Sequence, residues 1–116
     1  MKKLYVAVAL ATALAGTVVR AASTELASWY GLAHHGRRMA NGHRFDRFRL
    51  TAAHRTLKFG MMLKVCLAKT GKCVIVEVTD RGPFYGRRSL DLSEAAASVI
   101  GLKPYGVGMV TMEEVK

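Results

Sequence analysis

The chain has 116 residues, which is enough for one small domain. It carries 18 lysine and arginine residues against 8 aspartate and glutamate residues, so its formal net charge is +10. Such a charge attracts acidic polymers or surfaces. The sequence has no zinc-finger spacing and no aromatic RNA-binding pattern, so we expect no nucleic-acid partner.

The first 21 residues have the pattern of a secretory signal peptide. Two lysines, Lys2 and Lys3, precede an apolar run from Leu4 to Val19, and Ala21 offers a small residue for cleavage. The alternative is a membrane anchor, but a run of about 16 residues is short for a span that needs roughly 20. We therefore expect cleavage after Ala21, no membrane anchor afterwards, and a mature domain of residues 22–116 in the periplasm or outside the cell.

Short strands separated by turn residues are predicted for most of the mature chain. The first strand, over residues 27–31, is followed by a polar, basic segment over 32–48 that we predict to be a long loop. Long loops in small domains are usually functional or disordered. Residues 50–54 are predicted to be a short buried element, and further strands are predicted at residues 61–65, 73–78 and 106–115.

One segment, residues 91–101, is predicted to be helical. Asp91 or Ser93 can serve as its N-cap, and Gly101 can end it. Apolar residues recur at helical spacing along the segment, which indicates that one face packs on the core. A single packing helix and about six strands are typical of a mainly β protein built as a small closed barrel.

The two cysteines, Cys66 and Cys73, flank a predicted turn near Thr70 and Gly71. A hairpin with this turn would place their Cβ atoms opposite each other, about 4.5–5.5 Å apart, which is close to the range of a disulfide. Two buried free thiols are the alternative. Because exported proteins meet oxidising conditions, we predict a disulfide between Cys66 and Cys73.

Six short motifs follow one another along most of the mature chain. They are ASWYG at 27–31, GRRMANG at 36–42, FD at 45–46, LTAAHRTL at 50–57, DRGPF at 80–84 and DLSEAA at 91–96. Together they resemble the rare lipoprotein A family of septal lytic transglycosylases. The resemblance implies a six-stranded double-psi β-barrel with one short packing helix, a fold shared with plant expansins and barwin. It also implies endolytic, non-hydrolytic cleavage of peptidoglycan glycan strands that lack stem peptides, with 1,6-anhydro-muramic acid ends and no cofactor.

The resemblance assigns the catalytic groups to Asp80, His54 and position 43. The family has a glutamate at the last of these positions, where this chain has His43. One carboxyl group can perform both proton transfers of a lytic transglycosylase, because the sugar's own 6-hydroxyl attacks the anomeric carbon. We expect Asp80 to be that group. It needs a raised pKa, which a neighbouring glutamate favours and a protonated His43 opposes.

Four further residues near these motifs are predicted to bind the glycan strand: Tyr30, Asn41, Arg81 and Tyr85. Each assignment has a structural alternative. Tyr30 can be a core aromatic residue, Asp80 can cap a turn, and His54 can be a buried histidine that hydrogen-bonds the backbone.

The histidine at position 43 leaves two other functions open. The first is a catalytically weak, expansin-like module that binds or remodels peptidoglycan. The second is a metal-binding variant, in which His43, His54 and Asp80 would converge as a facial set for a divalent transition metal. We expect no metal in the natural protein, a peptidoglycan glycan strand as its partner, and a monomer.

Overall fold

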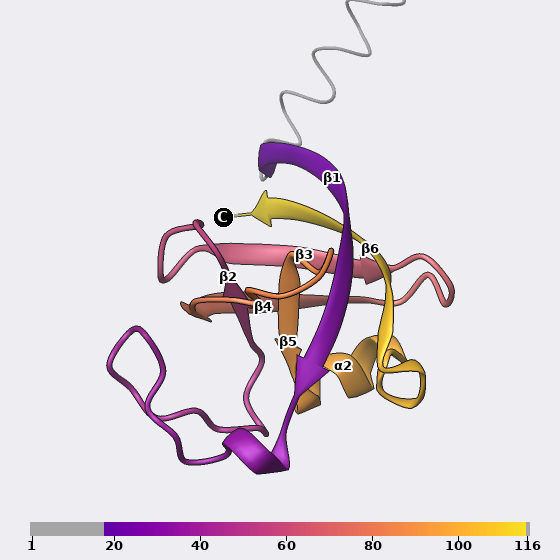
Figure 1. Cartoon of the computed structure of the whole chain (residues 1–116). Coiled ribbons are helices and arrows are strands. Elements are labelled where there is room, and N and C mark those ends of the chain that lie inside the picture. The colour runs from indigo at the N-terminus through magenta and orange to yellow at the C-terminus, as the bar shows by residue number, and fades with distance from the viewer. Residues whose placement is uncertain (1–17, 116) are drawn as a thin grey trace, which may run out of the picture.

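The computed structural model describes the backbone of residues 18–115 and the side chains of residues 22–115. Six strands close into a barrel in the order β1-β5-β2-β4-β3-β6 (Figure 1). The strands are β1 (Val18–Tyr30), β2 (Thr51–His54), β3 (Met62–Leu67), β4 (Cys73–Asp80), β5 (Leu90–Ser93) and β6 (Val107–Val115). The mainly β, six-stranded barrel predicted from the sequence is therefore confirmed.

The helices of the described chain are short. They are α2 (Glu94–Ile100) and two 3₁₀ helices, η1 (Leu32–His34) and η2 (Lys103–Tyr105). None of these helices is long and apolar enough to cross a membrane. Residues 1–17 of the predicted signal peptide lie outside the described part of the chain.

The barrel interior is filled by every second side chain of its strands. Leu63 and Val65 of β3 and Val76 and Val78 of β4 have no exposed surface, whereas Ile75 between two buried residues is 49% exposed. This alternation follows from the period of two residues in a β-strand. The interior side chains, together with one face of α2, form one continuous hydrophobic core.

A disulfide joins Cys66 and Cys73. The two residues lie opposite each other in the antiparallel pairing of β3 with β4. The predicted hairpin and its disulfide are thus both confirmed, and the bond closes the end of the hairpin next to the turn at Gly71.

The predicted helix is shorter than the sequence suggested. Ser93 is its N-cap, since its Oγ accepts a hydrogen bond from the N–H of Ala96 (3.2 Å), and Gly101 ends it in the left-handed conformation. Asp91 and Leu92 belong instead to β5, which pairs with β1 on one side and β2 on the other. Pairing with two distant strands outweighs the local helical signals here.

The loop between β1 and β2, residues 31–50, which we call the covering loop, lies outside the barrel (Figure 1). Backbone hydrogen bonds between Gly36 and Phe45 (2.8 Å) and between Phe45 and Arg37 (2.7 Å) close part of it into a narrow hairpin. Phe45 is buried in a second, smaller cluster with Tyr30, Met39 and Ala53. The covering loop is therefore packed on the barrel wall.

Candidate active site

Two carboxylates on the two strands that flank β2 pair with the same residue. Ala53 of β2 lies opposite Asp80 of β4 and also opposite Asp91 of β5. A register shift between Ala52 and Ala53 brings Asp80 into this position. Asp91 also lies opposite Ser28 of β1. Ser28, Asp91, Ala53 and Asp80 therefore form one row across four strands, which we call the carboxylate row.

The carboxylate row lies on the outer wall of the barrel. The neighbours of Asp91 along β5, Leu90 and Leu92, are fully buried in the interior. Because successive strand residues point to opposite faces, Asp91 points outward. Ala53 belongs to the cluster under the covering loop, whereas Ala52 belongs to the interior core. The methyl group of Ala53 is thus the only side chain of the row between the two carboxylates.

The carboxylate of Asp80 is held by backbone donors. Its Oδ1 accepts hydrogen bonds from the N–H groups of Ala40 (2.8 Å) and Arg81 (2.9 Å). The Ala40 donor belongs to the covering loop, and the neighbouring N–H of Asn41 donates to the carbonyl of Thr79 (3.3 Å). These bonds fix the tip of the covering loop on the end of β4.

Asp91 has a different environment. Its Oδ1 accepts a hydrogen bond from the Ser28 hydroxyl (3.0 Å), which in turn accepts one from Arg88 Nη1 (2.9 Å). Burial raises the pKa of Asp91, and the negative charge of Asp80 adds to this effect, while the Ser28 hydrogen bond and the charges of Arg88 and His34 oppose it. Asp91 therefore keeps its proton to a higher pH than an ordinary aspartate.

Tyr30 places a phenol beside both carboxylates. Its ring stacks on Phe45, with centroids 4.4 Å apart, and meets His34 edge-on. Burial first, and then the charges of Asp80 and Asp91, raise the pKa of Tyr30 above its usual range, so the phenol stays neutral. Tyr30 is 9% exposed, and its hydroxyl has no hydrogen-bond partner among the described residues. The hydroxyl is thus a buried polar atom that lacks a partner among the described residues.

His43 and Asn41 lie together in a cavity of about 410 Å³ between the covering loop and β4. The side-chain Oδ1 of Asn41 accepts a hydrogen bond from the N–H of His43 (3.0 Å). Glu77 and Thr79 of β4 line the opposite side of this cavity. The cavity thus adjoins Asp80, the next residue after Thr79.

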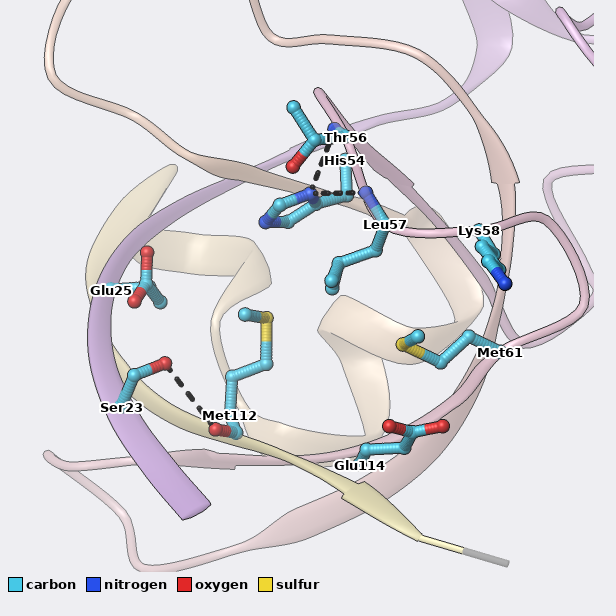
Figure 2. A pocket seen from close by; sticks show the side chains of 9 residues that line it. All are labelled: Ser23, Glu25, His54, Thr56, Leu57, Lys58, Met61, Met112 and Glu114. Carbon is cyan, nitrogen blue, oxygen red and sulfur yellow. Dashed lines mark hydrogen bonds between the residues drawn. The ribbon is translucent and has the colours of Figure 1, made fainter. Parts of the chain in front are cut away.

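His54 lies in a separate cavity of about 700 Å³ at the open end of the barrel, where its ring faces Glu25 and Glu114 across the opening (Figure 2). Its Nδ1 accepts hydrogen bonds from the N–H groups of Thr56 (3.2 Å) and Leu57 (3.1 Å). The proton of the neutral ring therefore sits on Nε2. Because Ala53 points outward, the next residue, His54, points inward, away from the carboxylate row.

Arg81 and Tyr85 occupy contrasting positions. Arg81 is half-buried over the ring of Phe59 (4.0 Å), and its Nη1 donates to the carbonyls of His54 (3.1 Å) and Leu57 (2.7 Å). Its guanidinium thus braces the turn after β2. Tyr85 is 81% exposed in the loop between β4 and β5, so its ring is available for stacking.

The structure thus brings together Asp80, Tyr30, Asn41 and the backbone of Arg81, with His43 in the adjoining cavity, but it places the His54 ring on the other side of β2. Within the described residues, no group of three or more histidine, cysteine, aspartate or glutamate side chains can hold a metal ion. The facial metal set of His43, His54 and Asp80 does not form among these residues, and the two histidines line different cavities.

Sequence reasoning missed Asp91, Ser28 and Arg88. Asp91 was assigned a capping role because it precedes a helix. The available signal was its place between two leucines, Leu90 and Leu92, an alternation typical of a strand with a polar outer face.

Comparison with known proteins agrees with this fold. Residues 22–112 match the lytic transglycolase family of double-psi β-barrel domains, and the chain belongs to that family. It is 53% identical over 91 residues to a probable endolytic peptidoglycan transglycosylase RlpA of Synechocystis, which covers 78% of this chain and 28% of that protein. It is 46% identical over 89 residues to endolytic peptidoglycan transglycosylase RlpA of Neisseria meningitidis, covering 77% of this chain and 37% of that protein. The chain therefore spans well under half the length of these relatives.

Solved structures show the same fold at low sequence identity. The Streptomyces papain inhibitor superposes with a TM-score of 0.66 at 21% identity, covering 85% of this chain and 99% of that one. An expansin of Clavibacter michiganensis superposes with a TM-score of 0.65 at 23% identity, covering 83% of this chain and 51% of that one. These likenesses establish the architecture alone.

Proposed function

We propose that this domain is an endolytic peptidoglycan lytic transglycosylase, which cleaves glycan strands lacking stem peptides and leaves 1,6-anhydro-muramic acid ends. The family and the names of the RlpA relatives support this activity. The observation that carries the proposal is the half-buried carboxylate of Asp80, fixed by two backbone N–H groups between the covering loop and β4. A carboxylate held in this way is oriented for proton transfer at a bound sugar.

The reaction needs no water and no cofactor. The 6-hydroxyl oxygen of the muramic acid attacks its own anomeric carbon, while the bond from that carbon to the neighbouring sugar's oxygen breaks. The leaving oxygen gains a proton and the attacking hydroxyl loses one, so atoms and charges balance. Asp80 is the group that we place at this reacting bond.

The residues around Asp80 bind the sugar or hold the site in position. Asn41 and His43 form one wall of the cavity beside Asp80 and provide polar contacts for a sugar. The exposed ring of Tyr85 offers a surface for stacking on a sugar face. His54 acts as a positioning residue: its ring holds the turn after β2, whose carbonyls bind Arg81 next to Asp80.

Charge supports the choice of substrate. The covering loop exposes Arg37, Arg38 and Arg44, and two of them also bind loop carbonyls, at Gly42 and Gly36. A glycan strand without stem peptides carries a free carboxylate on each muramic acid, so it is a polyanion. Complementary charge raises its local concentration at the site, and added salt weakens this attraction.

Location follows from the substrate. We propose that residues 1–21 are removed as a signal peptide and that the domain acts in the periplasm or outside the cell as a monomer. Cleavage after Ala21 leaves the part of β1 that pairs with β6 from Ser23 onward. N-terminal sequencing of the exported protein tests the cleavage site.

Analysis of glycan ends tests the activity. Stem-stripped strands are incubated with the protein, and the products are analysed by mass spectrometry. We expect anhydro ends with the natural protein and none with Asp80→Asn, whose amide keeps the shape but carries no transferable proton. Glu113→Gln, a charge-removing change on β6 opposite Lys64, serves as a matched control and should remain active. Strands that are retained by the protein but stay uncut would overturn the proposal in favour of an expansin-like binding module.

A further inference from the structure

The site lacks the glutamate that the family places at position 43, yet it contains a second carboxylate. Asp80 and Asp91 both lie opposite Ala53, on strands that flank β2. In the carboxylate row, only the methyl group of Ala53 lies between them. The acidic neighbour of Asp80 is thus supplied by the barrel wall.

We propose that Asp91 is the proton-donating acid of this site and that Asp80 is its ionised partner, so that two carboxyl groups of the carboxylate row share the two proton transfers. This inference rests on the proposed function and deepens it by assigning the acid and the base to different residues.

The hydrogen bonds of the two side chains differ in the way that this division needs. The Oδ1 of Asp80 accepts hydrogen bonds from two backbone N–H groups, which fix its position. Asp91 accepts one bond, from the Ser28 hydroxyl, and lies between two fully buried leucines. Burial raises the pKa of Asp91. Paired groups whose environments separate their protonation states are typical of an acid and a base in one site.

Four titratable or charged groups face Asp91 from the elements packed around it. They are Arg88 of the loop before β5, His34 of η1, Tyr30 of β1 and Asp80 of β4. Arg88 and His34 favour the ionised form of Asp91, and Asp80 favours the protonated form. The protonation of Asp91 is therefore set by a small number of side chains, each of which can be changed separately.

Tyr30 supplies an independent indication of a ligand between the two carboxylates. It lies two residues after Ser28 on β1, so it points to the same face as the carboxylate row. Its hydroxyl is buried without a hydrogen-bond partner among the described residues, and a buried hydroxyl is normally paired. A sugar hydroxyl bound between Asp80 and Asp91 would give it that partner.

The proposed step is balanced. The Asp91 proton passes to the glycosidic oxygen as its bond to the anomeric carbon breaks. The bond from the 6-oxygen to that carbon forms, and the 6-hydroxyl proton passes to the Asp80 carboxylate. Turnover ends with Asp80 protonated and Asp91 ionised, and exchange with solvent restores both groups.

The pH dependence of cleavage tests the assignment. An acid must be protonated to act, so activity falls as pH rises above its pKa. Ser28→Ala removes a hydrogen bond that favours ionised Asp91, and Arg88→Gln removes an opposing charge while keeping a donor for Ser28. Both variants should move the alkaline limb of the pH profile of kcat to higher pH. Asp91→Asn should lower kcat about 10²–10⁴-fold, and Glu113→Gln should leave the profile unchanged.

The possible outcomes separate the two proposals. If the natural protein forms anhydro ends, but Asp91→Asn remains active and the Ser28→Ala and Arg88→Gln profiles coincide with the natural one, the role of Asp91 is overturned and the proposed function stands. If Asp91→Asn does not fold, the two other variants still decide the question through their alkaline limbs. If the natural protein forms no anhydro ends, both proposals fail.

Discussion

The rings of Tyr30 and Phe45 are stacked, with their centroids 4.4 Å apart and their planes 23° from parallel. Tyr30 ends β1, and Phe45 lies in the covering loop, where it is only 2% exposed. The stack therefore attaches the covering loop to the barrel wall. The same loop delivers the Ala40 N–H to Asp80, so the packing of Phe45 and the position of the Asp80 carboxylate are mechanically connected.

We expect Phe45→Ala to destabilise the fold and to impair the site. Removing a buried phenylalanine costs about 3–5 kcal/mol in well-packed cores, and the small size of this cluster favours the lower end of that range. Urea denaturation gives the free energy of unfolding, and the glycan assay gives the activity. Phe48→Ala is a matched control, because Phe48 belongs to the same loop but is 69% exposed. A Phe45→Ala variant as stable as the natural protein would show that the loop is not docked.

Tyr30→Phe should separate stability from activity. The variant keeps the stack on Phe45 and removes a buried hydroxyl that has no partner among the described residues, so the free energy of unfolding should stay the same or rise. If the hydroxyl binds the sugar in the transition state, kcat should fall by roughly tenfold or more. Thermal denaturation and the glycan assay measure the two effects. A large loss of stability with unchanged kcat would contradict this account of Tyr30.

The pH dependence of stability should report Asp91. The fold raises the pKa of this side chain above its ordinary value of 3.8, so the folded protein keeps the proton at pH values where the unfolded chain has released it. The resulting stabilisation is complete below pH 3.8 and is lost as pH rises through the folded pKa. Asp91→Asn removes this loss of stability at higher pH, because the amide does not ionise.

We therefore expect Asp91→Asn to be more stable than the natural protein at neutral pH, with a smaller difference near pH 4. Urea denaturation over a series of pH values measures the difference, and Glu113→Gln serves as the control for removal of a negative charge. An Asp91→Asn variant that is less stable at every pH would mean that the carboxylate is needed for the Ser28 and Arg88 network rather than tolerated there.

With Asp91 as the acid and Asp80 as the base, His43→Glu should not raise the cleavage rate. The change restores a carboxylate in the cavity beside Asp80 and removes an imidazole that can become positive. A negative neighbour favours the protonated form of Asp80, so a faster variant would mean that Asp80 itself is the acid. His43→Gln separates the two effects, because it removes the imidazole without adding a charge. Equal rates for all three proteins, measured on stem-stripped strands, would show that Asp91 alone supplies the acidic neighbour.

Local signals in the sequence were sufficient to predict the hairpin of β3 and β4. Alternating apolar residues in β3 and β4 and a glycine-containing turn set the register that pairs Cys66 with Cys73, and all of these lie within a short stretch of chain. The barrel class could also be predicted, because the ordered motifs extend over nearly all of the mature domain.

Non-local pairing explains what the sequence did not reveal. β5 has only four residues and directly precedes a helix. Its possible N-cap residues therefore predict a helix start more strongly than its alternating leucines predict a strand. Its strand character comes from parallel pairing with β1, in which Asp91 lies opposite Ser28, more than half the chain away. The position of the His54 side chain could not be predicted from its motif alone. It depends on which side chains of β2 point outward: Ala53 points toward the carboxylates, so His54 points into the barrel.

Closure of the barrel has a consequence for how the domain can be handled. β6 is the strand that joins β1 to β3, so a chain cut before Val107 would expose two unpaired strand edges at once. Unpaired edges recruit strands from other molecules and lead to aggregation. A reporter or affinity tag fused after residue 115 leaves this seam closed, whereas deletion of the last strand should promote aggregation.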